Sequence, residues 1–231
     1  MLENPENVHR RQLLKQGFSS MIALSVGPVL TGCEDSNADF GASIQELFAA
    51  PTSNIENIGP LAIEPDENGF LLPPGFSSRV LAKTDQPAGP DGNYLWHDSP
   101  DGGAIYVTEG GGWIYVSNSE GFGGTGGVGA LEFDAEGNVI DAFRLLGGTT
   151  MNCAGGPTPW NSWLSCEEFD AGMVWECFPL GRGGIPAVRR DAMGVFQHEA
   201  AAIDPSSGIV YLTEDKGDGC LTSLYRISMA I

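Results

Sequence analysis

Basic side chains are scarce in this chain of 231 residues: 11 lysines and arginines stand against 30 aspartates and glutamates, and the formal net charge is −19. A protein with this charge repels nucleic acids and anionic membrane surfaces, so we expect neither as a partner. The same charge suits a protein that binds cations. If the substrate is an anion, bound metal must reverse the local field.

Several catalytic and binding motifs are missing from the sequence. It has no CxxC pair for a zinc ribbon, no GxSxG, no phosphate-binding P-loop and no GxGxxG that opens a helix. The glycine-rich residues 123–127 are predicted to be a turn, because no helix follows them. These absences argue against the corresponding nucleotide-binding and serine-hydrolase classes.

Helical periodicity is missing as well, because no long segment repeats its apolar residues at a helical spacing. Short apolar runs alternate instead with turns rich in Gly, Asp and Pro, and this pattern predicts an all-β domain. The expected strands are residues 104–108, 113–118, 128–133, 139–145, 160–166, 173–178, 209–213 and 221–227. Residues 155–157, Gly-Gly-Pro, are expected to form a turn.

A repeat favours a β-propeller over a β-sandwich. Three aromatic and apolar runs lead to acids at Glu120, Glu167 and Glu214, and successive acids are 47 residues apart. That period is close to one four-stranded propeller blade, and it places the acids at the same end of each blade. We therefore predict a partial β-propeller of three to four blades. Because a closed ring usually needs more blades, we expect the chain to be truncated at its C-terminus.

Residues 1–33 resemble a twin-arginine lipoprotein signal. The pair Arg10 and Arg11 precedes an apolar run that is too short and too interrupted for a good membrane span. The run ends in Leu-Thr-Gly-Cys at Cys33, which resembles the lipobox of bacterial lipoproteins, whose cysteine is acylated. We expect export to the periplasm or cell surface, with the membrane contacted only through lipid on Cys33. Residues 1–32 carry three basic and two acidic side chains, so their removal changes the net charge from −19 to −20.

The remainder divides into a linker and one folded domain. Residues 34–70 are expected to be a flexible tether, since much of this segment is rich in Asn, Pro, Glu and Ser. Residues 71–231 are expected to form the domain, and about 160 residues suffice for a hydrophobic core. Four cysteines in this domain permit disulfides in an exported chain, whereas folding in the cytoplasm before export argues against them: Cys153, Cys166, Cys177 and Cys220.

Acidic side chains follow the predicted strands at four places: Glu120, Glu167 with Glu168, Glu199, and Glu214 with Asp215. One such acid is usually solvated, but several on a repeat favour a hard cation such as calcium, or iron where a thiolate joins them. The histidines His97 and His198 are either site residues or structural residues, and the sequence leaves both readings open.

The most specific stretch is residues 152–168, NCAGGPTPWNSWLSCEE. With LPPGF at 72–76 and the segments 112–120, 127–131, 196–201 and 210–215, it resembles the PhoX family of secreted bacterial alkaline phosphatases. The resemblance implies a β-propeller exported by the twin-arginine route. It also implies an iron–calcium cluster at the propeller axis, held by glutamates, an aspartate and a cysteine.

This resemblance implies a metal-dependent phosphatase that hydrolyses small phosphate monoesters outside the cytoplasm, with Ca²⁺ and Fe³⁺ as cofactors. By likeness, the metal ligands are Glu120, Glu167, Glu199 and Asp215, with Glu168 and Glu214 as neighbouring alternatives. Cys153 and Cys166 are both candidates for the iron ligand, and no catalytic residue is assigned. The chain departs from the family at Gln197, where the phosphatases tend to carry a basic residue, so phosphate binding is expected to be weaker.

Two other functions fit the same sequence. One is a non-catalytic calcium-binding propeller that serves as a surface binding module. The other is a calcium-dependent, lactonase-like hydrolase. Iron together with calcium favours the phosphatase, whereas calcium alone favours the binding module.

Overall fold

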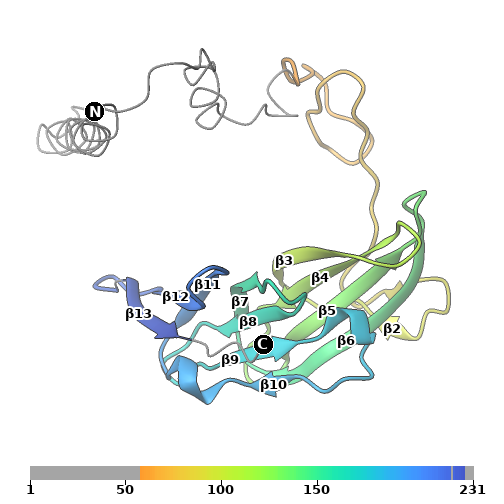
Figure 1. Cartoon of the computed structure of the whole chain (residues 1–231). Helices are drawn as coiled ribbons and strands as arrows, with labels where there is room; N and C mark the ends of the chain where they lie inside the picture. The colour runs from red at the N-terminus through yellow and green to blue at the C-terminus, as the bar shows by residue number, and fades with distance from the viewer. Residues whose placement is uncertain (1–57, 220, 227–231) are drawn as a thin grey trace, which may run out of the picture. The chain divides into compact units, whose positions relative to one another are not determined.

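Three antiparallel sheets follow one another along the chain in the computed structural model, which describes residues 58–219 and 221–226 (Figure 1). The first sheet has the strand order β3-β4-β5-β6, the second β7-β8-β9-β10 and the third β11-β12-β13. Strands that are consecutive in sequence are therefore neighbours in each sheet, as is common for short connections. A small sheet of β1 and β2 precedes the three.

The strands are β1 Pro87–Ala88, β2 Tyr94–Leu95, β3 Pro100–Val107, β4 Trp113–Ser119, β5 Gly126–Phe133, β6 Val139–Thr149, β7 Asn152–Pro157, β8 Trp163–Glu167, β9 Val174–Cys177, β10 Val188–Arg189, β11 His198–Asp204, β12 Ile209–Glu214 and β13 Leu221–Arg226. Two short 3-10 turns are η1 Pro179–Gly181 and η2 Asp191–Met193. The described residues contain no α-helix, so the all-β prediction is confirmed for this part of the chain. Nor does any helix there have the length and apolarity needed to cross a membrane.

The second strands of the first and third sheets, β4 and β12, show the alternation of side chains that a strand packed on one face requires. In β4, Ile114 and Val116 are fully buried while their neighbour Tyr115 is partly exposed. In β12, Val210 and Leu212 are fully buried. Successive side chains of a strand point to opposite faces, so each strand directs one apolar face inward.

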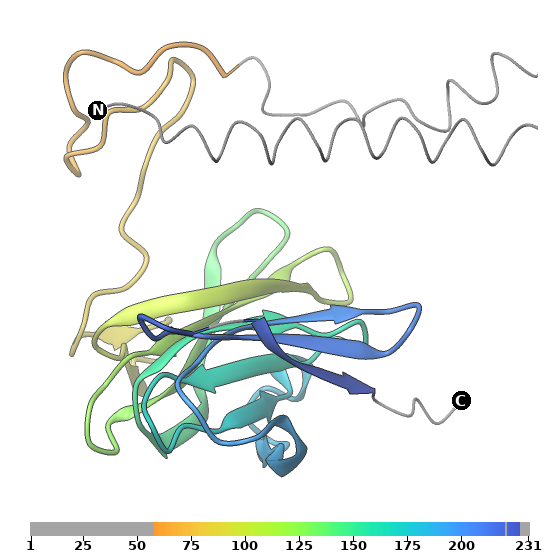
Figure 2. The same cartoon turned by 90° about the vertical axis from the view of Figure 1, so that its left-hand side faces the viewer.

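Two clusters of buried side chains hold the three sheets together. The first joins the first and second sheets and includes Ile114, Val116 and Trp163. The second joins the second and third sheets and includes Leu164 and Val210. Each fully buried side chain of this size contributes about 1.5–3 kcal/mol through removal of apolar surface from water. Both views show the third sheet beside the second (Figures 1 and 2).

The first strands of the three sheets, β3, β7 and β11, lie so close together that side chains do not fit between them. A Cβ on Gly102 in β3 would lie 2.8 Å from the Cα of Ala154 in β7. A Cβ on Gly156 in β7 would lie 1.8 Å from the carbonyl oxygen of Ala201 in β11. Residues 155–157 therefore belong to a strand, and the predicted Gly-Gly-Pro turn is wrong. Glycine is needed here for the close approach of a neighbouring backbone.

Other predictions fall on residues that the structure does not describe. The signal at 1–33, the acylated Cys33 and the tether as far as residue 57 lie outside the described residues, as does Cys220. These predictions remain to be tested.

Candidate metal site

The same irregularity occurs near the start of the first strand of each sheet. The pairing register jumps from Pro100 to Gly103, from Asn152 to Gly155 and from His198 to Ala201. In each case two residues of the first strand stand opposite one residue of the second strand, which makes a β-bulge. The first residue of each bulge has a side chain that can bind metal: Asp101, Cys153 and Glu199.

A second equivalent position in each sheet is the residue that directly follows the last residue of the second strand to pair with the first strand. An acid at this position donates its backbone N–H to the carbonyl of the residue that precedes the first strand. The bonds run from Glu120 to Ser99 at 2.9 Å, from Glu168 to Met151 at 2.8 Å and from Asp215 to Gln197 at 3.2 Å. The three sheets thus present two equivalent positions each, and all six side chains are potential metal ligands.

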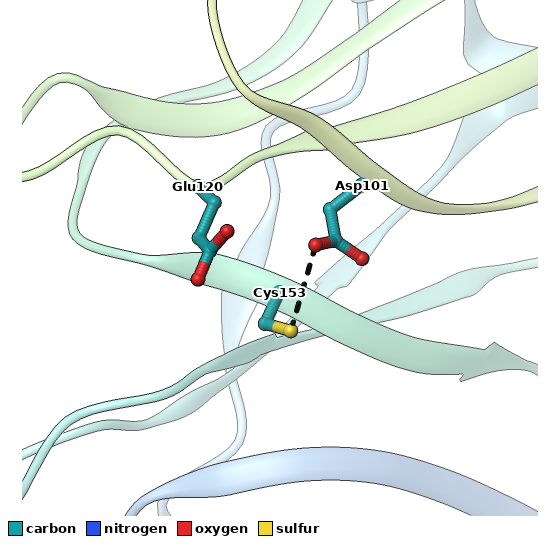
Figure 3. Close-up of side chains that lie close together, drawn as sticks. All are labelled: Asp101, Glu120 and Cys153. Carbon is teal, nitrogen blue, oxygen red and sulfur yellow. Dashed lines mark hydrogen bonds between the residues drawn. The ribbon is translucent and has the colours of Figure 1, made fainter.

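Five of these six side chains converge into two overlapping groups. One ligand atom from each of Asp101, Glu120 and Cys153 lies within 4.8 Å of the others, and Figure 3 shows the three side chains in one region. Cys153, Glu168 and Glu199 form a second group by the same measure. The Cys153 thiol belongs to both groups. Its Sγ lies 3.7 Å from Asp101 Oδ2 and 3.6 Å from Glu199 Oε1, and its single S–H can donate to either of the two oxygens.

Burial and mutual repulsion oppose negative charge in these groups. Burial raises the pKa of Glu168 and of Glu199, and neighbouring carboxylates add to both shifts. Asp215 is one of those neighbours for each of the two glutamates. Burial also raises the pKa of the Cys153 thiol, again with help from nearby carboxylates. A bound cation would favour the charged forms of all these groups.

No basic side chain neutralises the groups within residues 58–219 and 221–226. None of the ion pairs there joins a lysine or arginine to Asp101, Glu120, Glu168, Glu199 or Asp215. The carboxylates therefore keep their oxygens for another partner. A set of oxygen donors suits calcium, and carboxylates combined with a thiolate suit iron, so the side chains fit both ions.

Glu167, a ligand expected from the sequence, lies outside both groups. The residue is 6 % exposed, and its carboxylate accepts three hydrogen bonds. Oε1 accepts from the backbone N–H of Thr150 at 2.9 Å, and Oε2 accepts from Met173 N at 3.2 Å and Trp175 Nε1 at 3.1 Å. Of the other expected ligands, Glu120 and Glu199 lie within the groups.

The sequence repeat is one residue out of step with the backbone pairing. Ser119, Glu167 and Glu214 each pair with the first residue of the preceding strand, so Glu120 corresponds to Glu168 and Asp215. The same correspondence reveals Asp101, which the sequence analysis did not select. Asp101 is the second residue of the first strand of its sheet, as Cys153 and Glu199 are of theirs. This equivalence becomes visible only once the strand bounds are known.

The other described cysteines, Cys166 and Cys177, lie outside both groups, as do His97 and His198. Cys153, Cys166 and Cys177 are all free thiols, so these three form no disulfide with one another. His97 hydrogen-bonds Tyr94, and its other ring nitrogen lies 3.2 Å from Ser117 Oγ. His198 is fully buried and its ring lies against Phe196, with the centroids 3.6 Å apart.

Comparison with known proteins finds a partial likeness to one family. A family model described as alkaline phosphatase PhoX matches residues 129–177 and 169–226. No curated protein and no solved structure matches the chain. The matched region contains four of the six equivalent positions, namely Cys153, Glu168, Glu199 and Asp215. Over residues 129–226 the chain is therefore similar to the alkaline phosphatase PhoX family.

Proposed function

We propose that this chain is a metal-dependent phosphatase that hydrolyses small phosphate monoesters outside the cytoplasm. The observation that carries the proposal is the convergence of one thiol and several carboxylates from three sheets, in a chain that matches PhoX. The proposed ligands are Asp101, Glu120, Cys153, Glu168 and Glu199, with Asp215 beside them. Ca²⁺ and Fe³⁺ are the proposed ions.

We further propose that the three sheets are successive blades of a β-propeller. Three features support this: each sheet is a meander, the first strands lie side by side, and equivalent residues of each sheet converge. In a propeller the first strand of each blade lies next to the central axis. The bulges of β3, β7 and β11 would then present their side chains at one end of that axis.

The carboxylates and the thiol of the site would hold metal cations at the place where a phosphate ester binds. Bound cations would supply electrophilic charge that neutralises the phosphate oxygens and favours attack on phosphorus. Burial raises the pKa of Glu168, of Glu199 and of the Cys153 thiol, so a bound cation would compete with protons for these three groups. Gln197 brings no charge of its own, which leaves recognition of the anion to the cations.

The proposed location follows from the family and the leader together. PhoX proteins are secreted, and residues 1–33 resemble a twin-arginine signal that ends at a lipobox cysteine. We propose that the mature chain is tethered to a membrane by lipid on Cys33. Residues 34–70 would then act as the spacer.

Glu167, the last residue of β8, and Glu168, which follows it, provide a matched test of the site. Glu168→Gln removes one ligand charge and should lower the bound calcium and iron, as well as hydrolysis of a chromogenic phosphate ester at alkaline pH. Glu167→Gln makes the same chemical change one residue away, but replaces an acceptor by an amide that cannot satisfy all three donors. We expect it to lower the free energy of unfolding by about 1–3 kcal/mol and to have the smaller effect on metal content.

Elemental analysis and the phosphatase assay are run on the full-length protein expressed with iron and calcium, and Thr84→Ala is the control outside both groups. Equal metal content in the parent and Glu168→Gln proteins would contradict the site. Bound calcium without turnover would refute the phosphatase and support the second candidate, a calcium-binding module. The lack of basic partners around the carboxylates in the described residues favours that candidate.

A further inference from the structure

The side chain of Asn118, near the end of β4, reaches from the first sheet into the second. It is fully buried. Its Nδ2 donates to the carbonyl oxygen of Cys153 at 3.0 Å and to that of Ala154 at 2.6 Å. Its Oδ1 accepts from Trp163 Nε1 and from Ser165 Oγ, both at 2.9 Å. A side-chain amide has two N–H donors and two acceptor sites, so Asn118 uses all of them.

The two carbonyls that Asn118 binds belong to the bulge of β7. Cys153 and Ala154 together stand opposite the single residue Cys166 of β8, so the regular ladder is interrupted there. Buried backbone groups that lose ladder partners need other partners. Asn118 supplies a donor to both carbonyls, and it thereby fixes the backbone from which the Cys153 side chain extends.

Asn118 also lies next to the corresponding bulge of its own sheet. It is the one residue of β4 that stands opposite Asp101 and Gly102 of β3. This side chain therefore connects two bulges that each provide a potential ligand. Gly102 packs directly on the bulge of β7, since a Cβ added to Gly102 would lie 3.0 Å from the Cys153 carbonyl oxygen.

The position of Cys153 matters to both halves of the candidate metal site. Its Sγ is the only atom shared by the Asp101–Glu120 group and the Glu168–Glu199 group among the described residues. A displacement of the β7 backbone at this point would change the distances in both groups together. A buried amide with four hydrogen bonds opposes such a displacement.

We propose that Asn118 is a positioning residue of the metal centre, which holds the Cys153 thiol between the two groups of carboxylates. This inference rests on the proposed metal site, but it does not depend on the phosphatase reaction. If Asn118 only joined the two sheets, its replacement would lower stability and leave coordination by the thiolate unchanged. Positioning predicts that coordination changes as well.

The variant Asn118→Asp separates these two roles. An aspartate has nearly the same size and can still accept from Trp163 and Ser165, but its carboxylate offers no N–H to the two carbonyls of the bulge. The matched control is Trp163→Phe, which removes one hydrogen bond to Asn118 and keeps both donations to the bulge. Urea unfolding of each protein measures the structural effect.

The probe is Co²⁺ alone, added to the metal-free chain, because its thiolate charge-transfer absorption reports a bound cysteine without any turnover. We expect Asn118→Asp to bind Co²⁺ about 10–100-fold more weakly and to lose most of this absorption. Trp163→Phe should retain both. If Asn118→Asp fails to fold, Asn118→Ser replaces it, since a short hydroxyl cannot reach both carbonyls.

Unchanged affinity and absorption in Asn118→Asp, or equal losses in Trp163→Phe, would overturn the proposal. A parent chain without thiolate absorption would also overturn it, because Cys153 would then not be a ligand. Thiolate absorption in a parent chain that hydrolyses no phosphate ester would refute the phosphatase alone.

Discussion

His97 illustrates how a single buried titratable residue makes stability depend on pH. The side chain is 4 % exposed, and its ring nitrogens lie 2.9 Å from Tyr94 Oη and 3.2 Å from Ser117 Oγ. Burial, followed by the nearby charge of Arg144, lowers the pKa of His97 from 6.5 to about 4, while Asp98 opposes the shift. The folded protein therefore keeps His97 neutral at pH values where the unfolded chain binds a proton.

We expect His97 to reduce stability as the pH falls from 6.5 towards 4, because the unfolded state then binds more protons. Between pH 7 and pH 4.5 the loss from this residue should be about 2 kcal/mol, since each pKa unit corresponds to about 1.4 kcal/mol. Urea unfolding of the parent and of His97→Gln at both pH values measures it. The free energy of the parent should fall more than that of the variant, and equal slopes would show that His97 does not titrate in this way.

The first strands of the three sheets pack closely against one another, and glycines make this close approach possible. Gly156 of β7 faces the carbonyl of Ala201 in β11, and a Cβ would come within 1.8 Å of that oxygen. A substitution here must push two backbones apart, and neither can yield by a change of rotamer. Because β7 and β11 carry Cys153 and Glu199, this movement would also reach the candidate site.

Gly156→Ala should therefore lower the free energy of unfolding by about 1–3 kcal/mol, the usual cost of inserting atoms into a packed interior, or more. It should also weaken calcium binding. Gly217→Ala is the matched control, since a Cβ there has no atom within 4 Å. Thermal unfolding and calcium titration of both variants give the comparison. A Gly156→Ala protein as stable as the control would show that the two strands are not tightly apposed.

A comparison of the first and second strands of the sheets shows where prediction from sequence succeeded and where it failed. The second strands β4 and β12 were predicted within one residue, because alternation of apolar side chains is a local property. The strands β7 and β11 were missed, because their sequences lack the local apolar alternation of a strand. Their glycines, acids and histidine instead suit contacts with other sheets, which a single segment of sequence does not reveal. The register of Glu168 relative to Glu120 depends on pairing between strands, and a count along the chain placed Glu167 there instead.

For the whole molecule, the net charge of −19 bears on how the chain would attach to a membrane through the proposed leader. A chain with so few basic residues has little attraction for anionic lipid headgroups. Attachment to a membrane must then come from a hydrophobic group, and Cys33 is the proposed acceptor. One acyl chain alone gives reversible binding, so stable attachment requires more than one.

Cys33→Ala should move the protein from the detergent phase to the aqueous phase in a phase-partition experiment on cells that export it. Mass spectrometry of the parent should find acyl groups on Cys33 and no residues before it. Cys166→Ala, at a fully buried cysteine of the second sheet, is the control that should leave partitioning unchanged. Intact residues 1–33 without acylation would show that the lipobox resemblance is misleading.

A bulge recurs in β3, β7 and β11, and it allows the donor atoms of the proposed metal site to change without a change in the fold. One backbone position occurs three times, and the donor at each is a single side chain: Asp101, Cys153 or Glu199. Exchange of sulfur for oxygen at Cys153 would turn a mixed donor set into one made only of oxygen, with the strands left in place. Selectivity between soft and hard ions could thus drift in evolution by point substitution, while the scaffold stays constant.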